Sequence, residues 1–557
     1  MTTPSLLITR RTALAAAVGA LAWRPSLAAT AGAGAAPEAL HLLDRCAYGP
    51  APGDLERATR LGPDAWLDEQ LHPERLPLPA PLSQQLAALT TPTQSQHELV
   101  SRYRELEASA KRAIADAGAA SDAQFAATPP ADRPRIPDMA ERRELVQLVH
   151  FEAGDARLLQ ALGSPRQLQE VMVEFWFNHF NVFDGKGLVR VLVESYEREA
   201  IRPNVFGKFR TMLGATAKHP AMLFYLDNWL SVAPGYQPRR QGGNRQLSGL
   251  NENYARELME LHTLGVDGGY TQADVTELAR MLTGWTMGGG RRRGGTDAGS
   301  GDSIFTFDAD RHDNGTKNWL GKTVGPNGIG EGEFALDTLA RHPQTARHIA
   351  WKLAQRFVAD EPPPALVERV ARRFLDTDGD LRAVVKAVVD SPEFRDPRHR
   401  ATKFKTPYQY VLSSVRATGI ATTNVKPLMA VLAQLGQPLY GCQTPDGWHD
   451  TEADWLNPNA ITQRVNFATA LASGKLPLQR VDDPNAPVPA LKAMERQADK
   501  DMARAEAAEG STPPVDATAL LATLGPAISD RTRSAIAQSQ PALRAALVLG
   551  SPDFMRR

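Results

Sequence analysis

Carboxylate and imidazole side chains lie among large apolar residues in the segment Gln167–Phe183. At helical spacing, one polar stripe on this segment consists of Glu170, Glu174, Asn178 and Asn181. His179 lies outside the stripe, on an apolar face. A helix that is apolar nearly all round is usually buried, and a buried carboxylate without a partner costs several kcal/mol. Glu174 and His179 are therefore candidates for acid/base chemistry.

A second titratable group lies in the segment Asn253–Leu264. Its apolar face is predicted to consist of Tyr254, Leu258 and Leu261, and a charged ladder opposite consists of Glu252, Arg256 and Glu260. Glu257 falls at the edge of the apolar arc, and His262 falls on the apolar side. We expect Glu257 to be half-buried with a raised pKa unless a cation reaches it.

Both segments contain a glutamate five residues before a histidine. This spacing places the two side chains about 140° apart on a helix, unlike the pairs of zinc-binding His-Glu-x-x-His helices. A metal site would have to form between helices, with Glu174, His179, Glu257 and His262 around one cavity. A buried hydrogen-bonded network that fixes helix packing is the alternative, and it is favoured.

A third cluster follows Phe307 and contains His312, Asp313 and Lys317, residue types that perform acid/base and anion-binding work. A solvated loop with a turn at Asn314-Gly315 is the alternative. Further along the chain, the stretch Pro445–Trp448 is interpreted as an anchored turn rather than as a platform for a ligand.

Composition and missing motifs exclude several classes of protein. The chain has 557 residues, with 63 Lys and Arg against 63 Asp and Glu. A neutral chain is a poor candidate for a dedicated nucleic-acid binder, which needs a basic face. There is no Gly-x-Ser-x-Gly motif, no phosphate-binding loop and no dinucleotide fingerprint. Serine esterases, nucleotide triphosphatases and Rossmann oxidoreductases are therefore disfavoured.

The elements that must position these side chains are mostly helices. Apolar residues recur every three or four positions, which predicts helices at Glu141–Ala161, Gln167–Phe183, Asn253–Leu264, Thr271–Trp285, Thr345–Val358, Leu381–Val389, Phe404–Thr418 and Ala460–Ala472. We expect a mostly α protein with a large multi-helix body of two lobes, long loops and at most a short β-hairpin, for which Ile304–Phe307 is the best strand. Flexible loops are expected near residues 236–250 and 288–301, and a charged linker or helix at 490–510.

A weak repeat predicts how the chain ends. Ala387–Phe394 resembles Leu547–Phe554, and each reads as a helix end followed by Ser-Pro, an acidic residue and Phe. Proline forbids continuation of the helix, and the phenylalanine can fix the exit. We therefore expect the last residues to dock on the body.

Residues 1–30 have the features of a twin-arginine signal peptide. Arg10-Arg11 precede a short apolar stretch, Thr12–Ala22, and Arg24 follows it. A general secretory signal with a chance arginine pair is the alternative. We expect the chain to use the twin-arginine translocase and to be periplasmic or secreted. No later segment has the roughly 18 consecutive apolar residues of a membrane span.

The chain has two cysteines, Cys46 and Cys442. Two cysteines are too few for a disulfide-dense scaffold or a cysteine-rich zinc module. After export the two could form a disulfide, and two buried free thiols are the alternative.

Several motifs together resemble one bacterial family. They are Leu42–Pro50, Phe175–Phe180, Asn251–Leu261, Leu282–Trp285 and His312–Lys317. In this order they are similar to the domain of unknown function 1800 (DUF 1800), over roughly residues 38–557. The resemblance implies an exported, mostly helical protein. It also implies a partner from a second exported family, domain of unknown function 1501 (DUF 1501), which resembles alkaline phosphatases and sulfatases. The family carries no agreed reaction or catalytic residues. Cys46 and His262 depart from its usual residues.

Three functional hypotheses follow. The first is an exported enzyme acting on an extracellular polymer or glycan, with Glu174 and Glu257 as acid/base carboxylates and with His179, Arg256 and His312 orienting groups or stabilising charge. Its substrate-binding candidates are Asn178, Asn181, Asn253, Asp313 and Lys317. The second is a non-catalytic partner or maturation factor for the phosphatase-like or sulfatase-like protein. The third is a metalloprotein. The cofactor is unknown, and no metal ligand is assigned.

Overall fold

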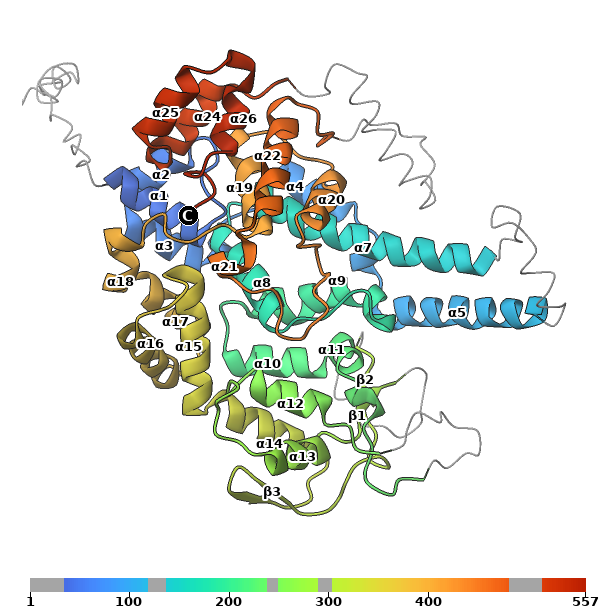
Figure 1. Cartoon of the computed structure of the whole chain (residues 1–557). Coiled ribbons are helices and arrows are strands. Elements are labelled where there is room, and N and C mark those ends of the chain that lie inside the picture. Colours follow the sequence, from blue (N-terminus) through green and yellow to red (C-terminus); the bar gives the residue numbers. More distant parts are fainter. Residues whose placement is uncertain (1–34, 119–136, 238–248, 289–302, 480–512) are drawn as a thin grey trace, which may run out of the picture.

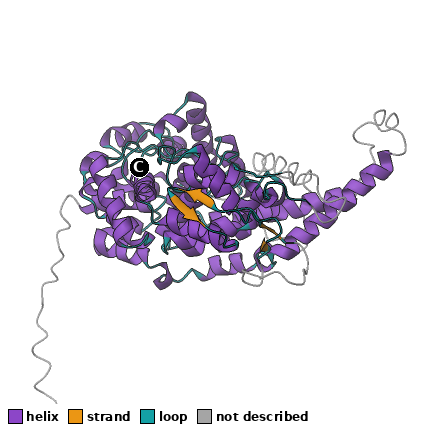
Figure 2. Ribbon diagram, turned by 90° about the horizontal axis from the view of Figure 1, so that it is seen from below, coloured by secondary structure: helices purple, strands orange, loops and turns teal. Residues whose placement is uncertain are grey.

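The computed structural model describes residues 35–118, 137–237, 249–288, 303–479 and 513–557. Helices dominate these residues, and the strands form two short antiparallel pairs (Figures 1 and 2). The prediction of a mostly α fold is confirmed. The expected signal peptide, the central parts of both expected loops and the 490–510 segment lie outside the described residues.

The upper part of Figure 1 combines helices from both ends of the chain. Its first helices are α1 (Ala35–Cys46), α2 (Asp54–Leu61), α3 (Pro63–Leu71) and α4 (Ala80–Ala87). The later ones are α19 (Pro407–Thr418), α20 (Lys426–Gln434), α21 (Glu452–Trp455), α22 (Pro458–Ala472), α24 (Ala517–Leu524), α25 (Asp530–Ala537) and α26 (Arg544–Leu549). The packing of α1 and α2 near α24 joins segments that are far apart in the sequence.

The lower part of Figure 1 comes from the middle of the chain. It contains α10 (Phe209–Lys218), α11 (Pro220–Tyr225), α12 (Asn253–Glu260), α13 (Gln272–Met281) and α14 (Ile329–Ala340). Strand β1 (Trp285–Met287) pairs with β2 (Phe305–Phe307), and β3 (Lys317–Trp319) pairs with β4 (Lys322–Val324). The predicted strand at Ile304–Phe307 is therefore present, as one half of the first pair.

Helices α8 (Gln167–His179) and α15 (Pro343–Phe357) lie between the upper and lower helices. Beside α15 are α16 (Pro364–Asp376), α17 (Leu381–Val389) and α18 (Pro392–Arg395). Short turns of helix at Val193–Ser195 (α9) and Tyr196–Ile201 follow α8. The buried apolar side chains form one core that includes Trp176 of α8, Leu258 of α12 and Leu353 of α15.

Two long helices extend beyond this body. They are α5 (Gln96–Gly118) and α7 (Pro137–Gly163), which run side by side to the right in Figure 1. The inner part of α7 is apolar and enters the core through Val149, Ala153 and Leu158. The outer parts of the two helices therefore form an arm that leaves the body.

The last residues dock on the body, as the weak repeat predicted. The backbone N–H of Arg557 donates to the carbonyl of Lys403 at 2.9 Å, and the N–H of Lys405 donates to the carbonyl of Met555 at 2.9 Å. In each copy of the repeat the serine side chain accepts from the phenylalanine N–H, at Ser391 with Phe394 and at Ser551 with Phe554. This docking buries the side chain of Arg557.

Cys46 and Cys442 are both buried free thiols, so the alternative of a disulfide is wrong for this structure. Cys46 ends α1 inside the apolar core. The Cys442 Sγ instead lies 3.7 Å from the carbonyl oxygen of Thr444, within its own loop. None of the described helices combines the length and the hydropathy of a membrane span.

Candidate functional site

A cavity of about 320 Å³ opens where α8, α15 and the loop 444–451 meet. Side chains from these three segments form its wall, together with Thr406 just before α19 and Gln437 shortly after α20. The lining residues are Glu174, Phe175, Asn178, His179, Trp351, Lys352, Gln355, Arg356, Thr406, Gln437, Asp446, Trp448, His449, Asp450 and Thr451. Concave sites with a few convergent polar groups are the usual places for ligands.

Helix α8 contributes Glu174, Asn178 and His179 to the cavity. Its apolar residues, among them Trp176 and Phe177, are buried on the other sides. The helix therefore has little freedom to turn, and its polar stripe is held toward the cavity. The structure brings together Glu174, Asn178 and His179, three of the site residues predicted from the sequence.

The carboxylate of Glu174 forms a buried ion pair with the guanidinium of Arg356 on α15. A second Arg356 nitrogen lies 3.4 Å from Asp450. A buried charge is stable only when paired and hydrogen-bonded, and this pair meets that condition. Glu174 is therefore a positioned anion. The sequence predicted Glu174 as an acid/base carboxylate, and in the structure a guanidinium occupies that carboxylate.

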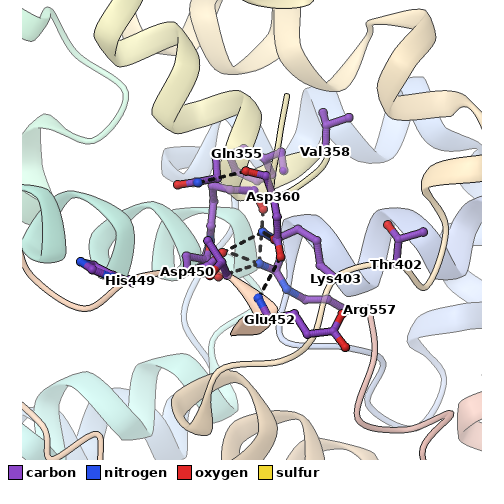
Figure 3. A network of polar contacts seen from close by, with 12 residues as sticks. Gln355, Val358, Asp360, Thr402, Lys403, His449, Asp450, Glu452 and Arg557 are labelled. Carbon is purple, nitrogen blue, oxygen red and sulfur yellow. Dashed lines mark hydrogen bonds and ion pairs between the residues drawn. The ribbon is translucent and has the colours of Figure 1, made fainter. Parts of the chain in front are cut away.

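A wider network of charges extends from Asp450 (Figure 3). Arg557 lies 3.4 Å from Asp450, and Lys403 donates to the Asp450 carbonyl at 2.9 Å while its ammonium also pairs with Asp360. Burial alone would raise the pKa of Asp450, but Lys403, Arg356 and Arg557 together lower it. The network holds one end of the cavity loop against the body.

The loop 444–451 is also fixed by the amide side chains of Asn178 on α8 and of Asn181 just after it. Asn178 donates to the carbonyl of Trp448 at 2.8 Å and accepts from the Trp448 N–H at 2.7 Å. Asn181 donates to the carbonyls of Cys442 and Thr444. Gly447 has φ of 74°, and a Cβ there would lie 2.3 Å from the Asn178 carbonyl oxygen. The stretch Pro445–Trp448 is thus an anchored turn, as predicted, and it also lines the cavity.

Three histidines gather behind the cavity wall. The His179 ring lies 6.2 Å from that of His262 and 6.1 Å from that of His348, and His179 Nε2 is 3.1 Å from the His262 carbonyl oxygen. Burial, with the charge of Lys352 as the next cause, lowers the pKa of His262 to about 3 and of His348 to about 4. Within the described ranges, no three His, Cys, Asp or Glu side chains are arranged to hold a metal.

Glu257 lies on α12, outside the cavity wall. It is half-buried, and burial, followed by repulsion from Glu260, raises its pKa, while Asp446 in the cavity wall adds to the shift. The raised pKa agrees with the expectation from the sequence. Arg256 points elsewhere, because it donates to Gln272 at 2.8 Å and pairs with Glu252.

Asn253 likewise serves the fold, since its side chain donates to the carbonyl of Leu226 at 3.3 Å. The structure therefore supports neither Arg256 nor Asn253 as a residue of the cavity.

His312 belongs to a separate cluster near the strands. Its Nε2 lies 2.9 Å from Glu331, and the ammonium of Lys317 lies 2.5 Å from the other Glu331 oxygen. Asp313 accepts from Arg280 at 2.8 Å. These side chains are enclosed, with His312 3% and Lys317 0% exposed. The expectation that His312, Asp313 and Lys317 join Glu174 is wrong, because the cluster packs β3 against α13 and α14. The solvated-loop alternative holds for the exposed residues 314–316 but not for the enclosed side chains of His312, Asp313 and Lys317.

The comparison with protein families covers nearly all of this fold. The family described as "Protein of unknown function (DUF1800)" matches residues 41–556. The chain belongs to the DUF1800 family. No curated protein and no solved structure matches it.

The cavity of this DUF1800 protein also depends on residues that the sequence analysis did not single out. Trp351, Lys352 and Arg356 come from α15, and Asp446 and His449 come from the loop. The only local signal was a pair of cations one helical turn apart, Lys352 and Arg356, beside a tryptophan on an amphipathic helix. That pattern is ordinary for a surface helix.

Proposed function

We propose that this DUF1800 protein is an exported enzyme that binds a saccharide in the cavity between α8, α15 and the loop 444–451, and acts on it with carboxylates. The observation that carries the proposal is the composition of the cavity wall, in which two tryptophans lie among carboxylates and amides. Sugars present apolar C–H faces and many hydroxyls, so they are bound by aromatic rings together with planar polar groups.

The tryptophans are suitably placed for such a ligand. Trp351 is 40% exposed. The Trp448 ring lies 6.0 Å from that of Trp455 at an angle of 58°, so a neighbouring ring supports it. Asn178 fixes the backbone of Trp448 on both sides. An aromatic surface held in this way loses little entropy when a ligand packs on it.

The acid/base pair in this proposal consists of Asp446 in the cavity wall and Glu257, which lies outside the wall but near enough for Asp446 to raise its pKa. Glycoside hydrolysis needs one carboxylic acid to protonate the leaving oxygen and one carboxylate to activate water. The raised pKa of Glu257 suits the proton donor. Asp446 faces the cavity and takes the proton of the water that attacks the anomeric carbon. His449, 3.3 Å from Asp446, has a raised pKa through its bonds to Asp454 and Asp446 and orients that carboxylate.

The test uses the mature chain on polysaccharides and oligosaccharides, with new reducing ends detected by mass spectrometry. Glu257→Gln is expected to lower turnover by about 10²- to 10⁴-fold, the contribution of general acid catalysis. Glu252→Gln is the matched control, since Glu252 bonds to Gln272 and Thr276. Trp448→Ala is expected to abolish binding. A folded Glu257→Gln variant with full turnover would remove the acid role.

We further propose export by the twin-arginine route to the periplasm or the exterior. The support is the sequence alone: Arg10-Arg11, the apolar stretch Thr12–Ala22 and the following Arg24. Residues 1–34 lie outside the described part of the chain. An extracellular polymer would meet the cavity only after such export.

A second candidate function is that of a partner or maturation factor for a DUF 1501 protein that resembles phosphatases and sulfatases. The arm formed by α5 and α7 favours it, because the outer parts of these helices extend away from the body and contribute nothing to the cavity (Figure 1). Co-expression of the two proteins is expected to give co-elution and mutual thermal stabilisation. Separate elution with unchanged melting temperatures counts against this role.

A further inference from the structure

Lys352 differs from the other cations around the cavity. It lies on α15 one helical turn before Arg356, and both line the cavity wall. Arg356 pairs with Glu174 and Asp450, and Lys403 pairs with Asp360. Among the residues that the structure describes, no carboxylate forms an ion pair with Lys352.

The surroundings of Lys352 make this lack of a partner costly. Lys352 is half-buried in the cavity wall, and this burial lowers the pKa of its amine, while the charge of Asp446 opposes the shift. Burial, and then the charge of Lys352, lower the pKa values of His179 and His348, so these neighbouring imidazoles are neutral and neither repel nor pair with the ammonium. An ammonium that has lost part of its hydration at a cavity wall is stabilised by a paired anion, and no carboxylate of the described residues forms that ion pair.

We propose that Lys352 is the subsite for an anionic group of the ligand, so that the saccharide bound in the cavity is an acidic one, carrying a carboxylate or a sulfate. This rests on the proposed saccharide function of the same cavity. The sugar ring packs on Trp448, and its anionic oxygens accept hydrogen bonds from the Lys352 ammonium. The ligand thereby supplies an ion-pair partner for Lys352, which has none among the described residues.

The ion pairs of Arg356 strengthen this assignment. Arg356 already pairs with two carboxylates, and its unpartnered Nε is buried, so it is not available to bind an anion of the ligand. Of the two cations that α15 sends into the cavity, only Lys352 can do so. A neutral sugar would fill the same volume but would leave the ammonium desolvated and unpaired, which costs binding free energy.

Binding of the mature protein to matched pairs of glycans tests the proposal. A glycan array presents uronate oligosaccharides beside their methyl esters, and sulfated oligosaccharides beside their desulfated forms. Binders are then titrated by calorimetry. We expect the acidic member to bind about 10- to 100-fold more tightly than its neutral match, the range of a charge-assisted hydrogen bond. Tighter binding of a uronate than of its methyl ester identifies the anionic group as a carboxylate. Tighter binding of a sulfated oligosaccharide than of its desulfated form identifies it as a sulfate.

Variants assign the preference to the amine. Lys352→Met is expected to remove the preference while leaving the binding of neutral sugars, and Lys352→Arg is expected to retain it. Lys386→Met is the matched control. Lys386 is an exposed lysine of the neighbouring helix α17, and it pairs with Asp390 just after that helix. Thermal melting confirms that each variant is folded.

The outcomes separate the two proposals. Equal affinity for acidic and neutral glycans, or an acidic preference that survives in Lys352→Met, overturns the anionic subsite. If binding then still depends on Trp448, the saccharide function stands alone. If no glycan on the array binds, both proposals fall together.

Discussion

Replacing His262 by phenylalanine is expected to make the protein more resistant to acid. The imidazole of His262 is buried beside Phe180, with ring centroids 5.1 Å apart, and burial lowers its pKa from 6.5 to about 3. Its Nε2 is buried without a hydrogen-bond partner among the described residues. A phenyl ring of similar size would keep the packing and would not titrate.

The magnitude follows from linkage between protonation and folding. Below pH 6.5 the unfolded chain binds a proton at His262, but the folded chain does not do so until about pH 3. The free energy of unfolding therefore has its full value above pH 6.5. Between pH 6.5 and about pH 3 it falls by about 1.4 kcal/mol for each pH unit. At pH 5.0 the histidine thus costs about 2 kcal/mol relative to pH 7.5.

Urea unfolding followed by tryptophan fluorescence measures this difference. The free energy of unfolding of His262→Phe, relative to that of the unchanged protein, should be about 2 kcal/mol more favourable at pH 5.0 than at pH 7.5. His97→Phe is the control, because His97 is exposed on α5 and water solvates it in both states. An identical change at the two pH values would refute the argument that His262 is buried and neutral.

Two further predictions concern the ion pair and export. Arg356→Met is expected to lower the free energy of unfolding by about 3–5 kcal/mol, because Glu174 and Asp450 lose a buried partner. Adding Glu174→Gln should recover part of this loss in urea unfolding, and strictly additive effects would contradict the pairing. Replacing Arg10-Arg11 by two lysines is expected to leave the protein in the cytoplasm, and unchanged export on cell fractionation would contradict the twin-arginine route.

The sequence was sufficient for the helices because their pattern is local. Helix α17 occupies the predicted Leu381–Val389, and α22 begins two residues before the predicted Ala460. Helix α8 instead ends at His179, although apolar residues continue to Phe183. Where apolar residues continue at helical spacing past the last hydrogen-bonded turn, the sequence does not show at which residue the helix ends.

The site was only partly predictable because its parts meet through distant contacts. The buried polar stripe of α8 was visible from spacing, and it placed Glu174 and Asn178 correctly. The guanidinium that neutralises Glu174 comes from Arg356, 182 positions later in the chain. The same applies to His312, whose partner Glu331 encloses it away from the cavity. Periodicity reports which face of a helix is buried, but not which charge lies opposite it.

Lys352 and Arg356 together distinguish packing from binding in this cavity. They share one helix and line the same cavity, so a purely structural role would predict an ion-pair partner for both. Instead Arg356 has two carboxylate partners, and no described carboxylate pairs with Lys352. A fold that provides anions for one cation and leaves its neighbour open at a cavity indicates that the second anion arrives with a ligand.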